Sequence, residues 1–324
     1  MKKLALNIII SLLLVSCTNT DMITIIDCND IQGKPEYMHF KTENEGYMFT
    51  YKGNLYSETN TFVFKTTDGG KDWKQIYSGN GYLFSGSSVL LGNAIFGYIK
   101  NTEDIAKNNL FKLDLTTQEF KLLDFNIEAT GNIWGQNDSV SLNLYNQPQH
   151  YILTTDTNLS SFSLKSFDYT IKKDGVISDN TNTYFITYKN TLLIKNKNVY
   201  REIEINNPQS ITKIAENKVL IATNEQENAI NLYQFDAISN KFEKLQTIEN
   251  YSIIGHLQSN EKVIVGFVGN IKGMFVEYDL IYSTDKGKSW QIQKLKEKKL
   301  VSPNSLVDNI LYIYSGRKLQ KVTF

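Results

Sequence analysis

Short stretches in which apolar and polar residues alternate recur along most of the chain. Each is bounded by turn-forming residues, as in "TFVFK" before residue 66 and "YDLIY" before residue 283. Alternation with a period of two, rich in aromatic and β-branched residues, predicts strands. No long stretch has a helical period, and "TEDIAKNN" at 102–109 has room for one helical turn at most. The pattern therefore predicts an all-β protein.

Hairpin-like segments repeat at a regular spacing. They begin at Phe62, Leu110, Tyr151, Leu192, Leu232, Leu280 and Leu311. The intervals are 48, 41, 41, 40, 48 and 31 residues, and a four-stranded propeller blade needs about 40–50. We predict a single β-propeller over residues 22–324, with seven blades preferred and six or eight as alternatives. The short last interval predicts that "MITIID" at 22–27 supplies a missing outer strand.

The N-terminus has the layout of a secretory signal. Met1-Lys2-Lys3 is followed by an apolar run over 4–15 that is too short to span a bilayer, and then by Leu14-Val15-Ser16-Cys17. These last four residues resemble the lipobox of bacterial lipoproteins. The resemblance implies a signal peptide at 1–16, diacylglyceryl attached to Cys17, and a lipidated tether at 17–21. An ordinary secretory signal with a chance cysteine is the alternative.

The predicted anchor also bears on location and on disulfides. It would hold the protein at a membrane of the cell envelope as a lipoprotein. Thr18, where an aspartate would favour the inner membrane, favours the outer membrane, with the ring facing the periplasm or the surface. If Cys17 carries lipid, only Cys28 is left, so no disulfide can form within the chain.

One phrase is written twice, as "TTDGGKDW" and "STDKGKSW". Both copies share Thr/Ser-x-Asp-x-Gly-x-x-Trp and lie between two predicted strands. The carboxylate and hydroxyl can accept hydrogen bonds from the turn, glycine suits a positive φ, and the indole can pack on a neighbouring sheet. We therefore predict a structural role for these eight residues: Thr66, Asp68, Gly70, Trp73, Ser283, Asp285, Gly287 and Trp290.

The phrase resembles the Asp-box, or BNR repeat, of sialidases and related β-propellers. The layout around its first copy is also similar to photosystem II assembly-factor-like propellers. The resemblance implies that each box lies on the outer hairpin of a blade, away from the central site. Asp68 and Asp285 are then structural, and Asp114 and Asp236 end strands in the same way. No catalytic residue is assigned.

Composition weakens several catalytic hypotheses. Sialidases hold a substrate carboxylate with three arginines, and this chain has only Arg201 and Arg317. The three histidines, His39, His150 and His256, show no metal-ligand spacing, so we expect no metal and no cofactor. Lys+Arg and Asp+Glu are equal at 34 each, which gives no electrostatic basis for binding nucleic acid.

These observations favour a lipid-anchored, non-catalytic module that binds a protein or a glycan or assists assembly. Tyrosines on the predicted loops are candidate contacts: Tyr37, Tyr47, Tyr82, Tyr98 and Tyr145. A divergent glycoside hydrolase of the sialidase-like superfamily is the alternative, because such an enzyme needs only two suitably spaced carboxylates. The pairs Glu277/Asp279 and Glu103/Asp104 are the acids considered for it.

Overall fold

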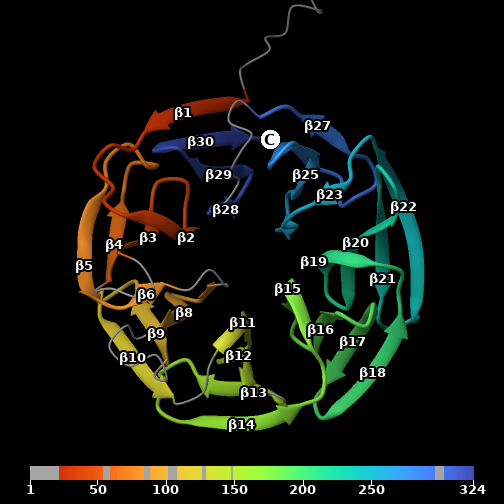
Figure 1. Ribbon diagram of the computed structural model, residues 1–324, viewed down its shortest axis with the longest axis horizontal. Coiled ribbons are helices and arrows are strands. Elements are labelled where there is room, and N and C mark those ends of the chain that lie inside the picture. Colours follow the sequence, from red (N-terminus) through yellow and green to blue (C-terminus); the bar gives the residue numbers. More distant parts are fainter. Residues whose placement is uncertain are drawn as a thin grey trace, which may run out of the picture.

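The chain forms a ring of seven sheets around a central axis (Figure 1). The computed structural model describes residues 22–53, 59–83, 88–100, 108–125, 129–146, 149–295 and 303–324. The predicted signal peptide, Cys17 with its tether, and the pair Glu103/Asp104 lie outside these residues. Within the described ranges every regular element is a β-strand, and no helix long and apolar enough to cross a membrane occurs. The protein is a seven-bladed β-propeller, as predicted.

Each blade has four main strands from the axis outward. The strands of blades 1, 2 and 3 are β2 (Lys34–Phe40), β3 (Gly46–Lys52), β4 (Asn60–Thr66), β5 (Lys74–Asn80); β6 (Tyr82–Leu83), β7 (Val89–Leu91), β8 (Ala94–Lys100), β9 (Asn108–Asp114), β10 (Phe120–Phe125); and β11 (Ala129–Gln136), β12 (Ser139–Asn146), β13 (Gln149–Asp156), β14 (Phe162–Phe167). In blade 2, β6 and β7 share the innermost place beside β8.

The remaining blades repeat this order. The strands of blades 4 to 7 are β15 (Ile171–Ser178), β16 (Asn182–Thr187), β17 (Thr191–Asn196), β18 (Val199–Glu204); β19 (Pro208–Ala215), β20 (Lys218–Gln226), β21 (Ala229–Asp236), β22 (Lys241–Glu249); β23 (Ile253–Ile254), β24 (Gln258–Ser259), β25 (Ile264–Lys272), β26 (Phe275–Ser283), β27 (Gln291–Gln293); and β28 (Asn304–Val307), β29 (Ile310–Ser315), β30 (Lys318–Thr323) with β1 (Ile23–Asp27).

Burial explains why the strands differ in sequence pattern. Second strands such as β16, with the sequence NTYFIT, are buried at every position because blades cover both of their faces. Outermost strands such as β18, with the sequence VYREIE, are mostly exposed. A continuous apolar run therefore marks a second strand, whereas more polar sequences mark the rim.

The N-terminal strand closes the ring. β1 pairs antiparallel with β30, with Ile23 opposite Val322 and Asp27 opposite Lys318. The prediction that residues 22–27 supply the outer strand is confirmed. The segment beginning at Leu311 was wrongly aligned, however: β29 and β30 are the second and third strands of blade 7, not the third and fourth. This offset accounts for the short last interval.

The two ends of the ring carry different connections. One end carries the turns that join first to second strands and third to fourth strands. We call it the motif end, because both copies of the repeated phrase lie there. Turns from second to third strands, and the links between blades, lie at the opposite end. Met22 is at the motif end: its carbonyl accepts from the Thr323 N–H at 2.9 Å, and the adjacent Phe324 N–H donates at 2.9 Å to Asn309 in the β28–β29 turn.

Hydrogen bonds join the inner strands of neighbouring blades. The Phe40 N–H donates to Ser305 Oγ at 2.8 Å, which ties blade 1 to blade 7. The Leu257 N–H donates to Ser210 Oγ at 3.0 Å, which ties blade 6 to blade 5. These bonds satisfy backbone groups that a sheet alone leaves open at its innermost edge. The ring is consequently a stiff platform for its loops.

Candidate functional site

The first copy of the repeated phrase is a turn held together by two side chains. Asp68 Oδ1 accepts from the Thr66 hydroxyl at 2.8 Å and from the N–H groups of Lys71 at 3.0 Å and Asp72 at 3.1 Å. Thr66 Oγ1 accepts from the Gly70 N–H at 3.0 Å. Three backbone N–H groups of the turn thus find their partners inside it.

Glycine and tryptophan complete the same turn. Gly70 has a φ of 92°, and its carbonyl accepts from Trp73 Nε1 at 2.9 Å. Trp73 is buried and packs edge-on against Phe40, with 6.1 Å between ring centroids. A Cβ on Gly70 would lie 2.3 Å from Leu319 Cδ2 of β30. The turn of blade 1 therefore lies tightly against blade 7.

The second copy repeats this geometry on blade 6. Asp285 Oδ1 accepts from the Ser283 hydroxyl at 2.8 Å, and Ser283 Oγ accepts from the Gly287 N–H at 2.8 Å. Trp290 Nε1 donates to the Gly287 carbonyl at 3.0 Å. A Cβ on Gly287 would lie 3.1 Å from Leu245 of β22, in blade 5. In both copies the turn of one blade contacts the outer half of the preceding blade.

Three other outer hairpins use an aspartate in a simpler way. Asp114 Oδ1 accepts from Thr116 N–H at 2.9 Å and Asp236 Oδ1 from Ile238 N–H at 2.9 Å. Asp156 Oδ1 accepts from Asn158 N–H at 2.7 Å. Hydrogen bonds from backbone N–H groups lower the pKa of Asp114 and Asp236, and the Ser160 hydroxyl has the largest part in lowering that of Asp156. Such carboxylates stay ionised, which suits a turn and does not suit a general acid.

Because the pKa of Asp285 is lowered in the folded protein, we expect a specific loss of stability in acid. Hydrogen bonds from the hydroxyl and N–H of Ser289, with that of the Ser283 hydroxyl, lower its pKa from 3.8 to about 2. Because the folded pKa is the lower one, the unfolded chain takes up the proton first. The stabilising contribution is present above pH 4 and is lost as the pH falls toward 2.

We expect Asp285→Asn to lose less stability than the wild type between pH 4 and pH 2, since the amide does not titrate there. Urea unfolding midpoints measured across this interval test the expectation. Lys288→Gln changes a charge in the same turn and leaves the carboxylate's hydrogen bonds in place, so it serves as the matched control. Identical pH profiles for Asp285→Asn and the wild type would contradict the assignment.

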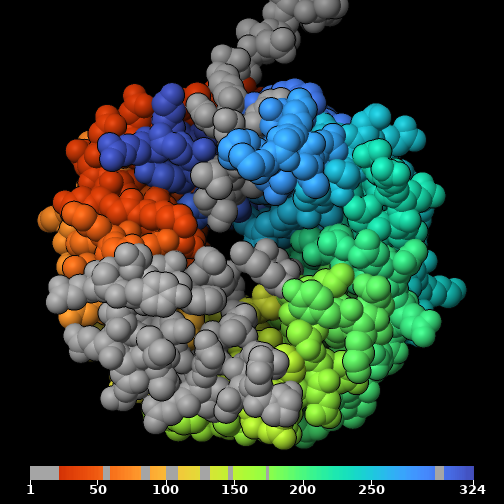
Figure 2. Space-filling model, in the orientation of Figure 1, coloured from red at the N-terminus to blue at the C-terminus, as the bar shows by residue number. Residues whose placement is uncertain are grey.

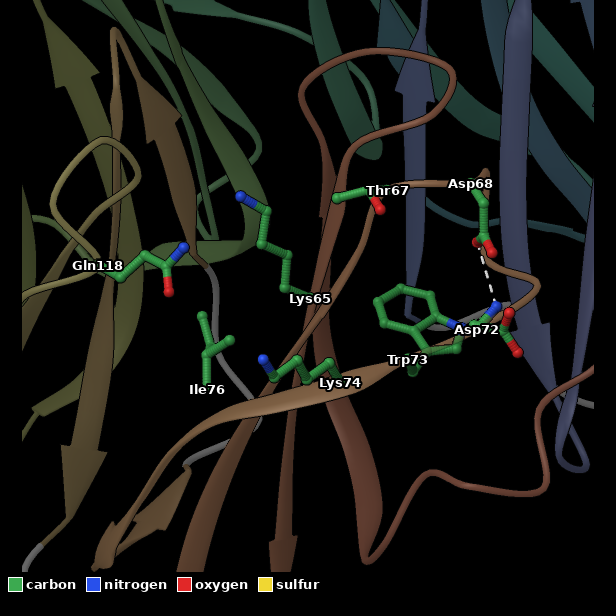
Figure 3. Close-up of a pocket in the computed structure, with 8 residues that line it drawn as sticks. All are labelled: Lys65, Thr67, Asp68, Asp72, Trp73, Lys74, Ile76 and Gln118. Atoms are coloured by element: carbon green, nitrogen blue, oxygen red, sulfur yellow. Dashed lines mark hydrogen bonds between the residues drawn. The ribbon is translucent and has the colours of Figure 1, made fainter.

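A pocket of about 390 Å³ lies beside the first motif, where blades 1 and 2 meet (Figure 3). Its lining consists of Lys65, Thr67, Asp68, Asp72, Trp73, Lys74, Ile76 and Gln118. Figure 3 shows the two lysine side chains on the side of Gln118, with Asp68 and Asp72 beyond Trp73. Lys65 already pairs with Glu45 at 3.0 Å. The pocket is a polar recess on the rim of the ring, and its two acids, Asp68 and Asp72, belong to the turn of the first motif.

Of the acids considered for a glycosidase, the described pair lies away from the axis. Glu277 and Asp279 belong to β26, the third strand of blade 6. Glu277 pairs with Lys272 at 3.0 Å. Asp279 is buried, and its Oδ2 accepts from Lys294 Nζ at 2.6 Å and from the Tyr251 hydroxyl at 2.9 Å. Nothing in the sequence pattern indicated this cluster, because its members come from a strand and two separate connecting segments.

The arginines and the described tyrosines do not form a substrate site. Arg201 lies on outer strand β18 and donates to the Ala237 carbonyl at 3.2 Å, whereas Arg317 is in the β29–β30 turn of blade 7. Tyr37, Tyr47 and Tyr98 are buried, so the prediction that they form an exposed contact surface is wrong. They pack in the core between blades. The side chains of Tyr82 and Tyr145 lie outside the described part.

The histidines are dispersed. His39 Nε2 lies 2.7 Å from Ser88 Oγ, and burial lowers the pKa of His39 to about 4. His150 Nε2 contacts Thr170 Oγ1 at 3.0 Å in a different blade. Among the described residues, no group of three His, Cys, Asp or Glu side chains is placed to hold a metal ion. The structure thus offers no metal centre in its described ranges.

Cys28 follows β1 and belongs to the core that closes the ring. It is a free, buried thiol in contact with the first motif, with its Sγ 3.8 Å from the Gly70 carbonyl oxygen. Burial raises the pKa of Cys28 to about 11. A thiol that stays protonated and enclosed is a poor nucleophile, so Cys28 fits a packing role.

Comparisons with known proteins find this ring in several solved structures. BamB from Moraxella catarrhalis is 12% identical, with a TM-score of 0.54 over 87% of this chain and 80% of that one. Oligogalacturonate lyase from Vibrio parahaemolyticus is 13% identical, with a TM-score of 0.58 over 93% and 96%. An uncharacterized protein from Listeria monocytogenes is 10% identical, with a TM-score of 0.57 over 87% and 91%.

At these identities the likeness shows the fold alone. No family model matches the chain, and no curated protein matches it by sequence. The similar structures include one named as a lyase and others whose names specify no reaction. One ring thus supports different functions, and function has to be argued from the side chains of this chain.

Proposed function

We propose that the protein is a lipid-anchored propeller of the cell envelope that acts as a non-catalytic binding or assembly module for a protein or a glycan. The observation that carries the proposal is that four acids of the described chain are already held by hydrogen bonds or ion pairs. Asp68 and Asp285 are held by their own turns, and Glu277 and Asp279 are each paired with a lysine. These contacts hold all four carboxylates in place, whereas glycoside hydrolysis requires two carboxylates that act on a substrate between them.

The anchor at Cys17 is the first part of the proposal to test. We expect radiolabelled palmitate to be incorporated into the wild-type chain in cells and not into Cys17→Ala, because the sulfur of Cys17 carries the diacylglyceryl group. Cys28→Ala is the matched control and keeps its label, since that thiol is enclosed in the ring. Equal labelling of the wild type and Cys17→Ala would remove the anchor from the proposal.

The absence of catalysis is tested separately. A panel of fluorogenic glycosides that includes sialosides, together with oligogalacturonate, is incubated with the purified protein. We expect no turnover above that of a heat-denatured sample. Turnover that disappears in Asp279→Asn or Glu277→Gln would overturn the binding hypothesis in favour of a divergent hydrolase, the alternative raised by the sequence.

A further inference from the structure

The hairpin between β25 and β26 ends in an exposed apolar tip. Of its five residues, Ile271–Phe275, three are large and apolar: Ile271 is 67% exposed, Met274 93% and Phe275 55%. The two strands are nine residues each and remain paired up to Lys272 and Phe275. We call residues 271–275 the hairpin tip. The register places Ile271 and Phe275 on opposite faces of the hairpin, with Met274 in its turn, so the tip presents apolar side chains on both sides. Exposed apolar surface of this kind is typical of an interaction site.

The tip is built to protrude. Gly273 turns the chain with a φ of 63°, and a Cβ placed on it would meet no atom within 4 Å. The side chain of Lys272 is 68% exposed and pairs with Glu277 at 3.0 Å, below the tip. Figure 2 shows this hairpin, in light blue, standing on the face of the ring toward the viewer. Its apolar side chains are thus offered outward on a well-formed hairpin.

If Cys17 is lipidated, the path of the chain keeps the anchoring bilayer away from the tip. A turn from second to third strand places the tip at the opposite end, whereas Met22 leaves the ring at the motif end. Only residues 18–21 separate Met22 from Cys17, a span of roughly 17 Å when fully extended. If Cys17 is lipidated, the motif end is held near the membrane and the tip points away from it.

We propose that the hairpin tip docks into an apolar groove of a partner protein in the cell envelope. This inference rests on the proposed function and names the surface that carries it. Met274 suits such a contact because its flexible thioether adapts to irregular grooves, and aromatic residues such as Phe275 are enriched at interface centres. The ion pair between Lys272 and Glu277 would lie at the polar rim of the interface with the partner.

Site-specific photo-crosslinking in cells tests this inference. The photoreactive residue p-benzoylphenylalanine replaces Met274 in one full-length chain, Ile238 in a second and Tyr188 in a third. Ile238 is 80% exposed at the motif end, and Tyr188 is 63% exposed at the same end as the tip. We expect one discrete protein adduct from position 274 and none from 238. Ile271→Asp in the position-274 chain should weaken that adduct at least tenfold, whereas Ile238→Asp should leave it unchanged.

The other outcomes overturn the inference. An adduct with lipid from position 274 would make the tip a membrane contact, and an adduct of twice the chain mass would make it a self-association surface. Adducts from position 188 without any from 274 would leave the binding module standing and remove the tip from it. No adduct from any position would count against both the docking of the tip and the proposed binding function. Unchanged melting temperatures of the Ile271→Asp and Ile238→Asp chains establish that the ring is intact in each comparison.

Discussion

Removal of β1 is expected to open the ring. A chain that begins at Cys28 lacks residues 22–27, and with them the buried side chain of Ile23, the partly buried Ile26 and the whole ladder to β30. Each buried apolar side chain of this size contributes about 1.5–3 kcal/mol. We therefore expect these two side chains alone to account for a loss of about 2–5 kcal/mol, a large part of the 5–15 kcal/mol typical of a folded domain.

Urea unfolding of the chains beginning at Met22 and at Cys28 measures this effect. The shorter chain exposes an unpaired edge of β30, so it should also self-associate in sedimentation experiments. A synthetic peptide of residues 22–27 added in excess should restore part of the lost stability. Equal unfolding midpoints and a monomeric shorter chain would show that β1 is dispensable for closure.

Trp73→Ala is expected to have the second large effect. Trp73 belongs to the closure core with Phe40, Tyr312 and Leu319, where Phe40 stacks on Tyr312 with 3.6 Å between ring centroids. Loss of a buried indole costs about 3–5 kcal/mol through the transfer free energy and the cavity left behind. The cavity would open at the junction between the first and the last blade, where the chain reaches blade 7 only through β1, a strand that hydrogen bonds alone join to β30.

Trp290→Ala is the matched control, because Trp290 makes the same hydrogen bond but is only partly buried, at the junction of blades 5 and 6, each of which is built from consecutive strands. We expect its free energy of unfolding to fall by less than that of Trp73→Ala. Trp73→Phe should recover part of the loss. A cost for Trp290→Ala equal to or above that for Trp73→Ala would contradict the special importance of the closure junction.

The predictions that succeeded rest on local patterns. The hydrogen bonds within each motif join residues two to four positions apart, such as Thr66 with Asp68 and with Gly70. Turn chemistry of this range is visible in a sequence. The blade count followed from the spacing of such turns. The assignment of Leu311 failed because blade 7 takes its fourth strand from the other end of the chain, so the local order of hairpins no longer matched the order of strands.

Burial and long-range pairing could not be predicted in this way. Tyr37 and Tyr47 were expected on loops, but both lie in the core because neighbouring blades cover the inner strands on both faces. The contact of Gly70 with Leu319 joins segments that only the closed ring brings together, and the contact of Asp279 with Tyr251 joins the third strand of blade 6 to the segment that enters that blade. No periodicity in the chain encodes these distances.

The all-β ring, its repeating unit and the strand that closes it could be predicted from the sequence, because strand alternation and turn chemistry are properties of neighbouring residues. Which surfaces are exposed, and at which end each lies, became known only from the folded ring. The N-terminal strand begins at one end of the ring and the apolar hairpin tip lies at the other. The end of the ring at which a turn lies depends on the direction of every preceding strand, and solvent exposure depends on which blades become neighbours.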